Sequence, residues 1–441
     1  MWYNGYVLIS AMPFFLKRSG ERVRIFGVIM TPNKSYKIKR NKLYYGFVRF
    51  LASLYSRLFF KNKVIRNELK GKKGPIVVIA NHQAALDFVN LIRRTREPMS
   101  FVISKSFYQL LPAPWFTGRL GLIPKQQFQT SLKDITTMKH AVADGEILVL
   151  YPAGLMCEDG VSTPIPVATY KFLQWIGADV YVARSYGTYF CTPKWATKKK
   201  NRWGRTEIDI YKLFDKEQLS EMEIDEIKER TDEALLFDAY REQDKLRHKY
   251  NGASDVRGLE NVLYVCPHCK SEYTIYADGK DTLRCSHCGF AEKSDEYGML
   301  HLASEVGEEI RYVSDWNKLI HDYERERILA GHDTLTSHAI IQCTTQKKRK
   351  YHDIGEGEIT LHADRFTLIG SAYGEGVEVD APTTNFASLP FSPGKYFEIQ
   401  HGDAIYRCLP DDKRLVTKFV NMVKIFYELH NEATVSAIDG K

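Results

Sequence analysis

The stretch Pro75–Ile92, PIVVIANHQAALDFVNLI, constrains the fold of this 441-residue chain more than any other. Ile76–Ala80 is a short, continuously apolar run rich in β-branched residues, which is typical of a strand buried on both faces of a parallel sheet. Asn81 follows as a favourable N-cap residue, and an apolar helical pattern runs on from Leu86. The stretch therefore predicts a buried strand leading into a helix, the repeating unit of an α/β fold.

His82 and Asp87 stand between this strand and the helical pattern. Residues five apart on one ideal helix point ~140° apart, so the two side chains can meet only if His82 is still in the loop. A neutral imidazole held by a carboxylate can act as a general base. Open α/β sheets place their chemistry at the C-terminal ends of strands, which is where this pair lies. Taken alone, the pair also fits a loop histidine that caps a helix.

Positive charge is concentrated in the first part of the chain. Residues 1–65 contain thirteen Lys and Arg and a single acidic residue, a net charge of +12 in a chain of net charge +8. Within them, Leu43–Phe60 predicts a strongly amphipathic helix, with Arg49 on the polar side and Leu51 and Leu54 on the apolar side. Such a helix suits a membrane interface, or packs on its own domain, and the charge favours an anionic membrane surface.

The first apolar run, Trp2–Leu16, does not have the form of a secretory signal. Its charges come after it, it contains Pro13, and it is shorter than the ~20 residues that a membrane-spanning helix needs. Met30 is a plausible alternative start. We therefore expect a protein attached peripherally to the cytoplasmic face of the membrane.

Strand and helix patterns alternate after His82. The predicted strands are Met99–Ser104, Leu120–Ile123, Glu146–Tyr151 and Val180–Ala183, and the predicted helices are Lys105–Leu111, Asp134–Ala143 and Ala168–Ile176. This alternation predicts an α/β fold with a mostly parallel sheet flanked by helices. A capping box at Ser220–Glu223 predicts one further helix that runs to about Arg241.

Four motifs within roughly residues 66–245 resemble, in order and spacing, those of the glycerolipid acyltransferases, the lysophosphatidate acyltransferase-like family. They are His82-x4-Asp87, Gly121-Leu122-Ile123-Pro124-Lys125, Tyr151-Pro152-Ala153-Gly154 and Gly177-Ala178-Asp179-Val180-Tyr181-Val182. The family has a glutamate where Ala153 stands and an arginine near Met156. Its basic residue in the second motif falls near Gln127, whereas Lys125 comes earlier.

The resemblance implies transfer of a fatty acyl group from acyl-CoA or acyl-carrier protein to a hydroxyl of a lysophospholipid or glycerol phosphate, in phospholipid biosynthesis. His82 would take the hydroxyl proton and Asp87 would hold its tautomer, as in a 1-acylglycerol-3-phosphate acyltransferase. The acceptor would be bound by Lys125, Arg119, Gly121, Pro152 and Gly154. The chain has no Gly-x-Ser-x-Gly nucleophile elbow, which argues against an α/β-hydrolase. A catalytically weak lipid-binding protein on the same fold is the alternative.

Four of the eight cysteines form two Cys-x2-Cys pairs. Cys266 and Cys269 are separated from Cys285 and Cys288 by fifteen residues, the spacing of a zinc ribbon. Four thiolates leave no open coordination position, so the expected Zn²⁺ is structural. The ribbon is nearly neutral, and for this reason no nucleic-acid partner is expected.

The remaining sequence predicts a helical connector and a small β-rich domain. Short strand patterns punctuated by Gly, Asp and Pro are followed by a helix over about Asp412–Asn431. This arrangement resembles pleckstrin-homology-like domains. The predicted organisation is a basic, amphipathic segment, an acyltransferase domain, the ribbon, the connector and the β-rich domain, at residues 1–65, 66–245, 255–300, 301–335 and 336–441.

Overall fold

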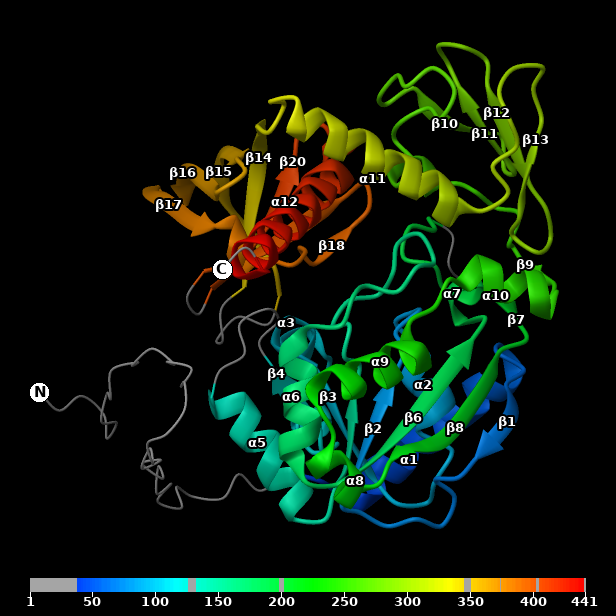
Figure 1. Cartoon of the computed structure of the whole chain (residues 1–441), viewed down its shortest axis with the longest axis vertical. Coiled ribbons are helices and arrows are strands. Elements are labelled where there is room, and N and C mark those ends of the chain that lie inside the picture. Colours follow the sequence, from blue (N-terminus) through cyan, green and yellow to red (C-terminus); the bar gives the residue numbers. More distant parts are fainter. Residues whose placement is uncertain are drawn as a thin grey trace, which may run out of the picture. The chain divides into compact units, whose positions relative to one another are not determined.

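The computed structural model describes residues 38–125, 132–197, 202–344, 350–372, 374–401 and 404–439 (Figure 1). The chain divides into two compact units, Met1–Ser35 and Tyr36–Lys441, and all described residues belong to the second. The predictions for Trp2–Leu16, Met30 and Gln127 lie outside the described residues.

A seven-stranded sheet in the order β1-β8-β6-β2-β5-β3-β4 forms the centre of the N-terminal half. Its strands are β1 (Lys63–Asn67), β2 (Ile76–Ala80), β3 (Met99–Ser104), β4 (Ile123–Lys125), β5 (Ile147–Leu150), β6 (Asp179–Tyr186) and β8 (Glu207–Phe214). Neighbouring strands are parallel except β6 and β8, so β8 and β1 run opposite to the other five. The predicted mostly parallel α/β sheet is confirmed.

Strand β2 is buried on both faces because helices cover the sheet on both sides. Val77 and Ile79 belong to one core with α5 (Leu132–Ala143) and α6 (Val167–Ile176). Ile76, Val78 and Ala80 belong to another with α1 (Lys42–Leu58) and α2 (Asp87–Leu91). Successive side chains of a strand point to opposite faces, so a run of five apolar residues fills both cores.

The helix predicted from Ser220 to Arg241 is wrong in its extent. Three helices occupy the region, α8 (Lys216–Glu221), α9 (Ile224–Leu235) and α10 (Ala239–Leu246). Met222 and Glu223 have extended backbones, with ψ of 146° and 149°, and break the run. Ser220 lies inside α8, where its hydroxyl donates to the Glu217 carbonyl at 2.7 Å, so it caps nothing.

Shorter elements complete this half of the chain. They are α3 (Lys105–Leu110), α4 (Pro114–Thr117), α7 (Thr188–Cys191), and the paired strands β7 (Trp203–Gly204) and β9 (Tyr250–Asn251). A four-stranded antiparallel sheet follows, made of β10 (Ile275–Asp278), β11 (Thr282–Cys285), β12 (Ala291–Ser294) and β13 (Leu300–Leu302). Helix α11 (Val313–Leu329) then leads to the C-terminal domain.

The C-terminal domain is an antiparallel sheet closed by one helix, as the sequence predicts. Its strands are β14 (Leu335–Thr344), β15 (His352–Leu361), β16 (Arg365–Ala372), β17 (Glu375–Pro382), β18 (Phe391–Ser392), β19 (Tyr396–His401) and β20 (Ala404–Pro410). The first strand pairs with the last, giving the order β17-β16-β15-β14-β20-β19-β18. Helix α12 (Leu415–Asp439) contributes Val416, Phe419, Val420 and Val423 to the core of this sheet.

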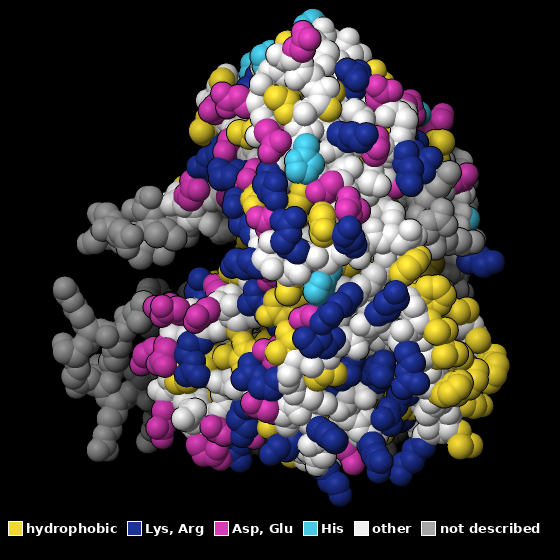
Figure 2. Space-filling model, turned by 90° about the vertical axis from the view of Figure 1, so that its right-hand side faces the viewer, with side chains coloured by type: hydrophobic (Ala, Val, Ile, Leu, Met, Phe, Trp, Pro, Cys, Tyr) yellow, Lys and Arg dark blue, Asp and Glu magenta, His cyan; other side chains and the backbone are white. Residues whose placement is uncertain are grey.

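Helix α1 turns its apolar side away from its own domain. Its buried residues are Tyr45, Ala52 and Ser56, which include small and polar side chains. The exposed large side chains form a surface that we call the apolar ridge: Leu43, Phe47, Phe50, Leu51, Leu54 and Leu58, with exposed fractions from 45% to 81%. Figure 2 shows a cluster of hydrophobic side chains with Lys and Arg side chains beside it. Among the described residues, no helix is long and apolar enough to cross a bilayer.

Candidate active site and cysteine cluster

The loop that carries His82 is fixed where β2 ends. The side chain of Asn81 donates to the Ser185 carbonyl and accepts from the Ser185 N–H, each at 2.8 Å. Asn81 therefore ties β2 to the end of β6 and does not cap a helix, contrary to the sequence prediction. Helix α2 begins only at Asp87, which leaves His82 in the loop.

His82 and Asp87 meet across this loop. His82 Nδ1 lies 3.0 Å from Asp87 Oδ2, and the same oxygen accepts from the Ala84 N–H at 2.9 Å. Asp87 is 2% exposed, whereas the His82 side chain is 22% exposed. A carboxylate only accepts hydrogen bonds, so Nδ1 carries the proton in the neutral ring and Nε2 is left free to accept one. The arrangement is that of an oriented general base.

Tyr151 closes one side of the pair. Its ring lies against the His82 ring, with centroids 4.5 Å apart and planes at 34°. Burial, and then the charge of Asp87, raises the pKa of the Tyr151 hydroxyl well above its usual value. That hydroxyl and Asp87 Oδ1 are both buried and have no hydrogen-bond partner among the described residues.

Gln83 is a supporting residue that the sequence analysis did not identify. It is fully buried, and its side-chain carbonyl accepts from the Thr188 hydroxyl at 3.1 Å and from the Tyr189 N–H at 3.4 Å. Its amide nitrogen donates to Glu242 Oε2 at 3.4 Å. These partners lie more than 100 residues away, so no local pattern could have indicated the role.

The second motif lies at the same edge of the sheet but apart from His82. Lys125 ends β4, which is separated from β2 by β5 and β3, so three strand spacings of ~4.8 Å place it roughly 14 Å away. Burial lowers the pKa of Lys125, and the charge of Asp134 acts in the opposite direction. Arg119 is exposed.

Gly121 has a packing reason for being glycine. Its φ is +80°, and a Cβ there would lie 2.6 Å from the guanidinium of Arg40. Arg40 in turn binds Glu146 at 2.7 Å and donates to the Ser100 hydroxyl at 2.6 Å. The absence of a side chain at Gly121 therefore leaves room for the Arg40 guanidinium to reach Ser100 and Glu146.

The third motif makes a turn directly after β5. The Gly154 N–H donates to the Tyr151 carbonyl at 2.9 Å, and Gly154 has φ of +70°. Pro152 and Ala153 are half-buried, and Gly154 is exposed. Ala153 brings no charge to this turn.

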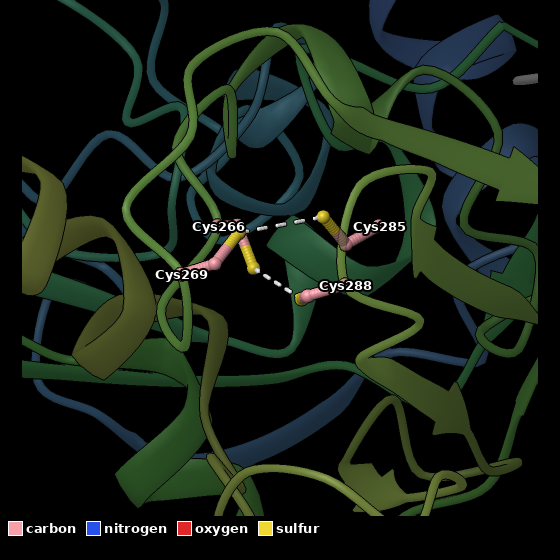
Figure 3. A group of neighbouring side chains, drawn as sticks. All are labelled: Cys266, Cys269, Cys285 and Cys288. Atoms are coloured by element: carbon pink, nitrogen blue, oxygen red, sulfur yellow. Dashed lines mark hydrogen bonds between the residues drawn. The ribbon is translucent and has the colours of Figure 1, made fainter.

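The four ribbon cysteines converge on one point (Figure 3). Their sulfur atoms all lie within 4.8 Å of one another, with 3.7 Å between Cys266 and Cys288 and 3.8 Å between Cys269 and Cys285. An ion bound tetrahedrally at about 2.3 Å from each sulfur requires sulfur separations of about 3.8 Å. The cluster therefore has the chemistry and spacing of a metal site with four thiolate ligands.

Comparison with known proteins identifies the class of the N-terminal domain. Residues 60–192 match a protein-family model described as Acyltransferase. The match contains His82, Asp87 and the second, third and fourth motifs, so the predicted likeness of this region to acyltransferases is confirmed. The match supports an enzyme that transfers acyl groups.

One solved structure similar to the chain is that of the 1-acyl-sn-glycerophosphate (LPA) acyltransferase PlsC from Thermotoga maritima. The two share 18% sequence identity with a TM-score of 0.33, over 43% of this chain and 80% of PlsC. No curated protein sequence matches the chain.

Proposed function

We propose that the protein transfers a fatty acyl group from an acyl thioester to a hydroxyl of a lysophospholipid or glycerol phosphate. The observation that carries the proposal is the His82–Asp87 pair at the end of β2, oriented with Nε2 free. The acyl donor is an acyl-CoA or an acyl-carrier protein, since either presents the thioester that this chemistry uses.

In the proposed reaction, His82 Nε2 takes the proton of the acceptor hydroxyl as its oxygen attacks the thioester carbonyl. The new C–O bond forms, the C–S bond breaks, and the leaving thiolate receives the proton from His82. Asp87 keeps the proton on Nδ1 and stabilises the imidazolium that forms. Lys125 and Arg119 neutralise the acceptor phosphate, with Gly121, Pro152 and Gly154 shaping that subsite.

Ala153 and Met156 favour an acceptor other than the usual phosphate monoester. A glutamate at position 153 would help to organise the cations that hold phosphate, and the half-buried Ala153 cannot. We therefore expect weak activity toward lysophosphatidate, and Ala153→Glu should shift acceptor preference toward it. Good use of lysophosphatidate by the wild type would contradict this view of the subsite.

We propose that the apolar ridge lies in the interface of an anionic membrane. Its side chains are exposed, and aromatic contacts join α1 to α4: Tyr44 lies 4.8 Å from Phe116 and 5.9 Å from Trp115, measured between ring centroids. Burial, and then the charge of nearby Arg57, lowers the pKa of Arg93, so at least two cations lie near one another beside α1. Apolar burial and anionic lipid attraction act together on such a surface.

The proposed membrane surface is directly connected to the catalytic loop. The Ser56 hydroxyl of α1 donates to the Asn90 side chain of α2 at 2.8 Å, and Asp87 begins α2. This hydrogen bond fixes α1 against the helix that begins at Asp87, which supports the proposal that the acceptor comes to His82 from the membrane.

For the cysteine cluster, we propose a structural Zn²⁺.

The deciding experiment is mass spectrometry of the products formed when purified protein meets mixed acyl thioesters and a panel of lysolipids and glycerol phosphate. We expect an acylated acceptor from the wild type and a loss of about 10²–10⁴-fold in turnover for His82→Ala. If no acceptor is acylated, and the protein binds lipid equally well with and without His82, the fold is used for lipid binding alone.

A further inference from the structure

The segment that follows β5 touches the catalytic loop at several points. We call residues 151–161 the third-motif segment. Tyr151 packs on the His82 ring, as described above. Six residues on, the Cys157 thiol donates to the Gln83 carbonyl at 3.7 Å. Gln83 follows His82 directly, so the position of this segment sets the position of the histidine.

Glu158 connects to Gln83 by a second route. The Tyr189 hydroxyl donates to the Glu158 carbonyl at 3.1 Å, while the Tyr189 N–H donates to the Gln83 side chain at 3.4 Å. Tyr189 is fully buried and receives a hydrogen bond from the Trp195 indole at 2.9 Å. Two short chains of contacts therefore run from Glu158 to the residue beside His82.

The other end of these contacts lies in the C-terminal helices. The Glu158 carboxylate forms an ion pair with Lys424 of α12, with side-chain exposures of 5% and 22%. Next to it, Asp159 Oδ2 accepts from the Asn317 side chain of α11 at 2.8 Å. The third-motif segment is thus held between the catalytic loop and two helices that follow the ribbon.

The ion pair keeps both partners charged despite burial. Burial alone would raise the pKa of Glu158, but the charges of Lys424 and Lys194 bring it below its usual value. Burial would likewise lower the pKa of Lys424, and Glu158 raises it. Lys424 is the cation in direct contact with Glu158, and a buried carboxylate that loses its ion-pair partner is destabilised. Loss of Lys424 should therefore loosen the segment even though the charge of Lys194 remains nearby.

We propose that Lys424 is a positioning residue for acyl transfer, which holds the His82 loop in its reactive geometry through Glu158 and the third-motif segment. The inference rests on the proposed function. It makes the C-terminal domain a part of the active-site assembly, because this cation comes from α12. Displacements of about 1 Å can lower turnover about 10²-fold, so small shifts of the loop are sufficient.

The test compares four variants in the full chain. Lys424→Met removes the cation, and Lys424→Arg keeps it. The double variant with Glu158→Gln and Lys424→Met removes both charges, so that no unpaired buried charge prevents folding. Arg325→Gln is the matched control, because Arg325 joins α11 to α12 through the exposed Glu432 at 2.7 Å without touching the third-motif segment.

We expect Lys424→Met and the double variant to lower kcat by about tenfold or more with little change in KM, because binding groups remain while the base is displaced. Lys424→Arg should restore most of kcat, and Arg325→Gln should leave it unchanged. Hydrogen exchange should rise in residues 82–86 and 155–161 of Lys424→Met and stay at the wild-type level in Arg325→Gln.

Two results would overturn the inference. One is a folded Lys424→Met protein whose kcat stays within about twofold of the wild type. The other is unchanged hydrogen exchange in residues 82–86 of that variant. An absence of acyl transfer in the wild type would instead refute the proposed function, and the exchange measurement would still decide whether Lys424 holds the His82 loop.

Discussion

Replacing Asp87 by asparagine tests most sharply the roles proposed for His82 and Asp87. Asp87 Oδ2 lies near two groups, His82 Nδ1 and the Ala84 N–H, while Oδ1 is buried and has no partner among the described residues. An asparagine can therefore enter in two orientations. With its oxygen in the Oδ2 position, the asparagine still accepts from His82 Nδ1 and from the Ala84 N–H. With its amino group in that position, two donors face each other and the Ala84 N–H loses its acceptor.

The Ala84 N–H selects the first orientation, since a buried N–H left without an acceptor costs about 1–3 kcal/mol. In that orientation the variant loses the negative charge that stabilises the imidazolium. Hydrogen bonds to charged groups contribute about 1–2 kcal/mol more than neutral ones, so turnover should fall roughly 5- to 30-fold. The loss should be smaller than the ~10²–10⁴-fold expected for His82→Ala, which removes the base itself.

The assay is kcat from the rate of product formation for wild type, Asp87→Asn and His82→Ala, with thermal unfolding to confirm that each protein is folded. Wild-type turnover in Asp87→Asn would refute the assignment of Asp87 as the partner of His82. A loss as large as that of His82→Ala would refute the selection of orientation by Ala84, because it would mean that the tautomer had been reversed.

Three other perturbations test separate parts of the molecule. Metal analysis should find about one zinc per chain, and Cys266→Ser with Cys285→Ser should abolish it while the acyltransferase domain stays folded; a folded, metal-free wild type would contradict the site. Leu51→Glu with Leu54→Glu should abolish sedimentation with anionic vesicles, and wild-type binding should weaken with salt; unchanged sedimentation would exclude the apolar ridge as the anchor. Burial raises the pKa of Glu292 from 4.5 to about 7, so the folded state binds the extra proton, and the free energy of unfolding should fall as pH rises between these values. Glu292→Gln should flatten that fall in denaturant titrations from pH 4 to 8, and an identical slope would refute the assignment.

The parts of the fold that could be predicted from sequence are those with local signals. A strand of five consecutive apolar residues must be covered on both faces, and β2 is covered by helices on each side of the sheet. The metal site could be predicted because its four ligands, Cys266, Cys269, Cys285 and Cys288, lie close together in sequence at a spacing typical of zinc ribbons. The placement of His82 in a loop followed from the angle between residues five apart on a helix, and α2 begins at Asp87.

The parts that could not be predicted depend on partners distant in sequence. Asn81 is a residue type favoured at N-caps, but its side chain is hydrogen-bonded to the backbone of Ser185 and cannot cap a helix. Helix α2 begins only at Asp87. The break between α8 and α9 occurs at Met222 and Glu223, inside a good capping pattern. Met222 packs against the core of the sheet, and its carbonyl accepts from the Gln174 side chain at 2.7 Å, so its partners too are distant in sequence. The ion pair between Glu158 and Lys424 could not be predicted either, because no sequence pattern links two residues 266 positions apart.

The separation between those two residues has a consequence for synthesis of the protein. Glu158 and Lys424 are 266 positions apart, so the ribosome translates the whole ribbon and nearly all of the C-terminal domain after the acyltransferase motifs have emerged. At about 5–20 residues per second this takes roughly 13–53 s. Throughout that interval the carboxylate of Glu158 has no cation from α12. A chain still being made therefore lacks the contact that holds the third-motif segment against α12, and that contact can form only once the final helix has been translated.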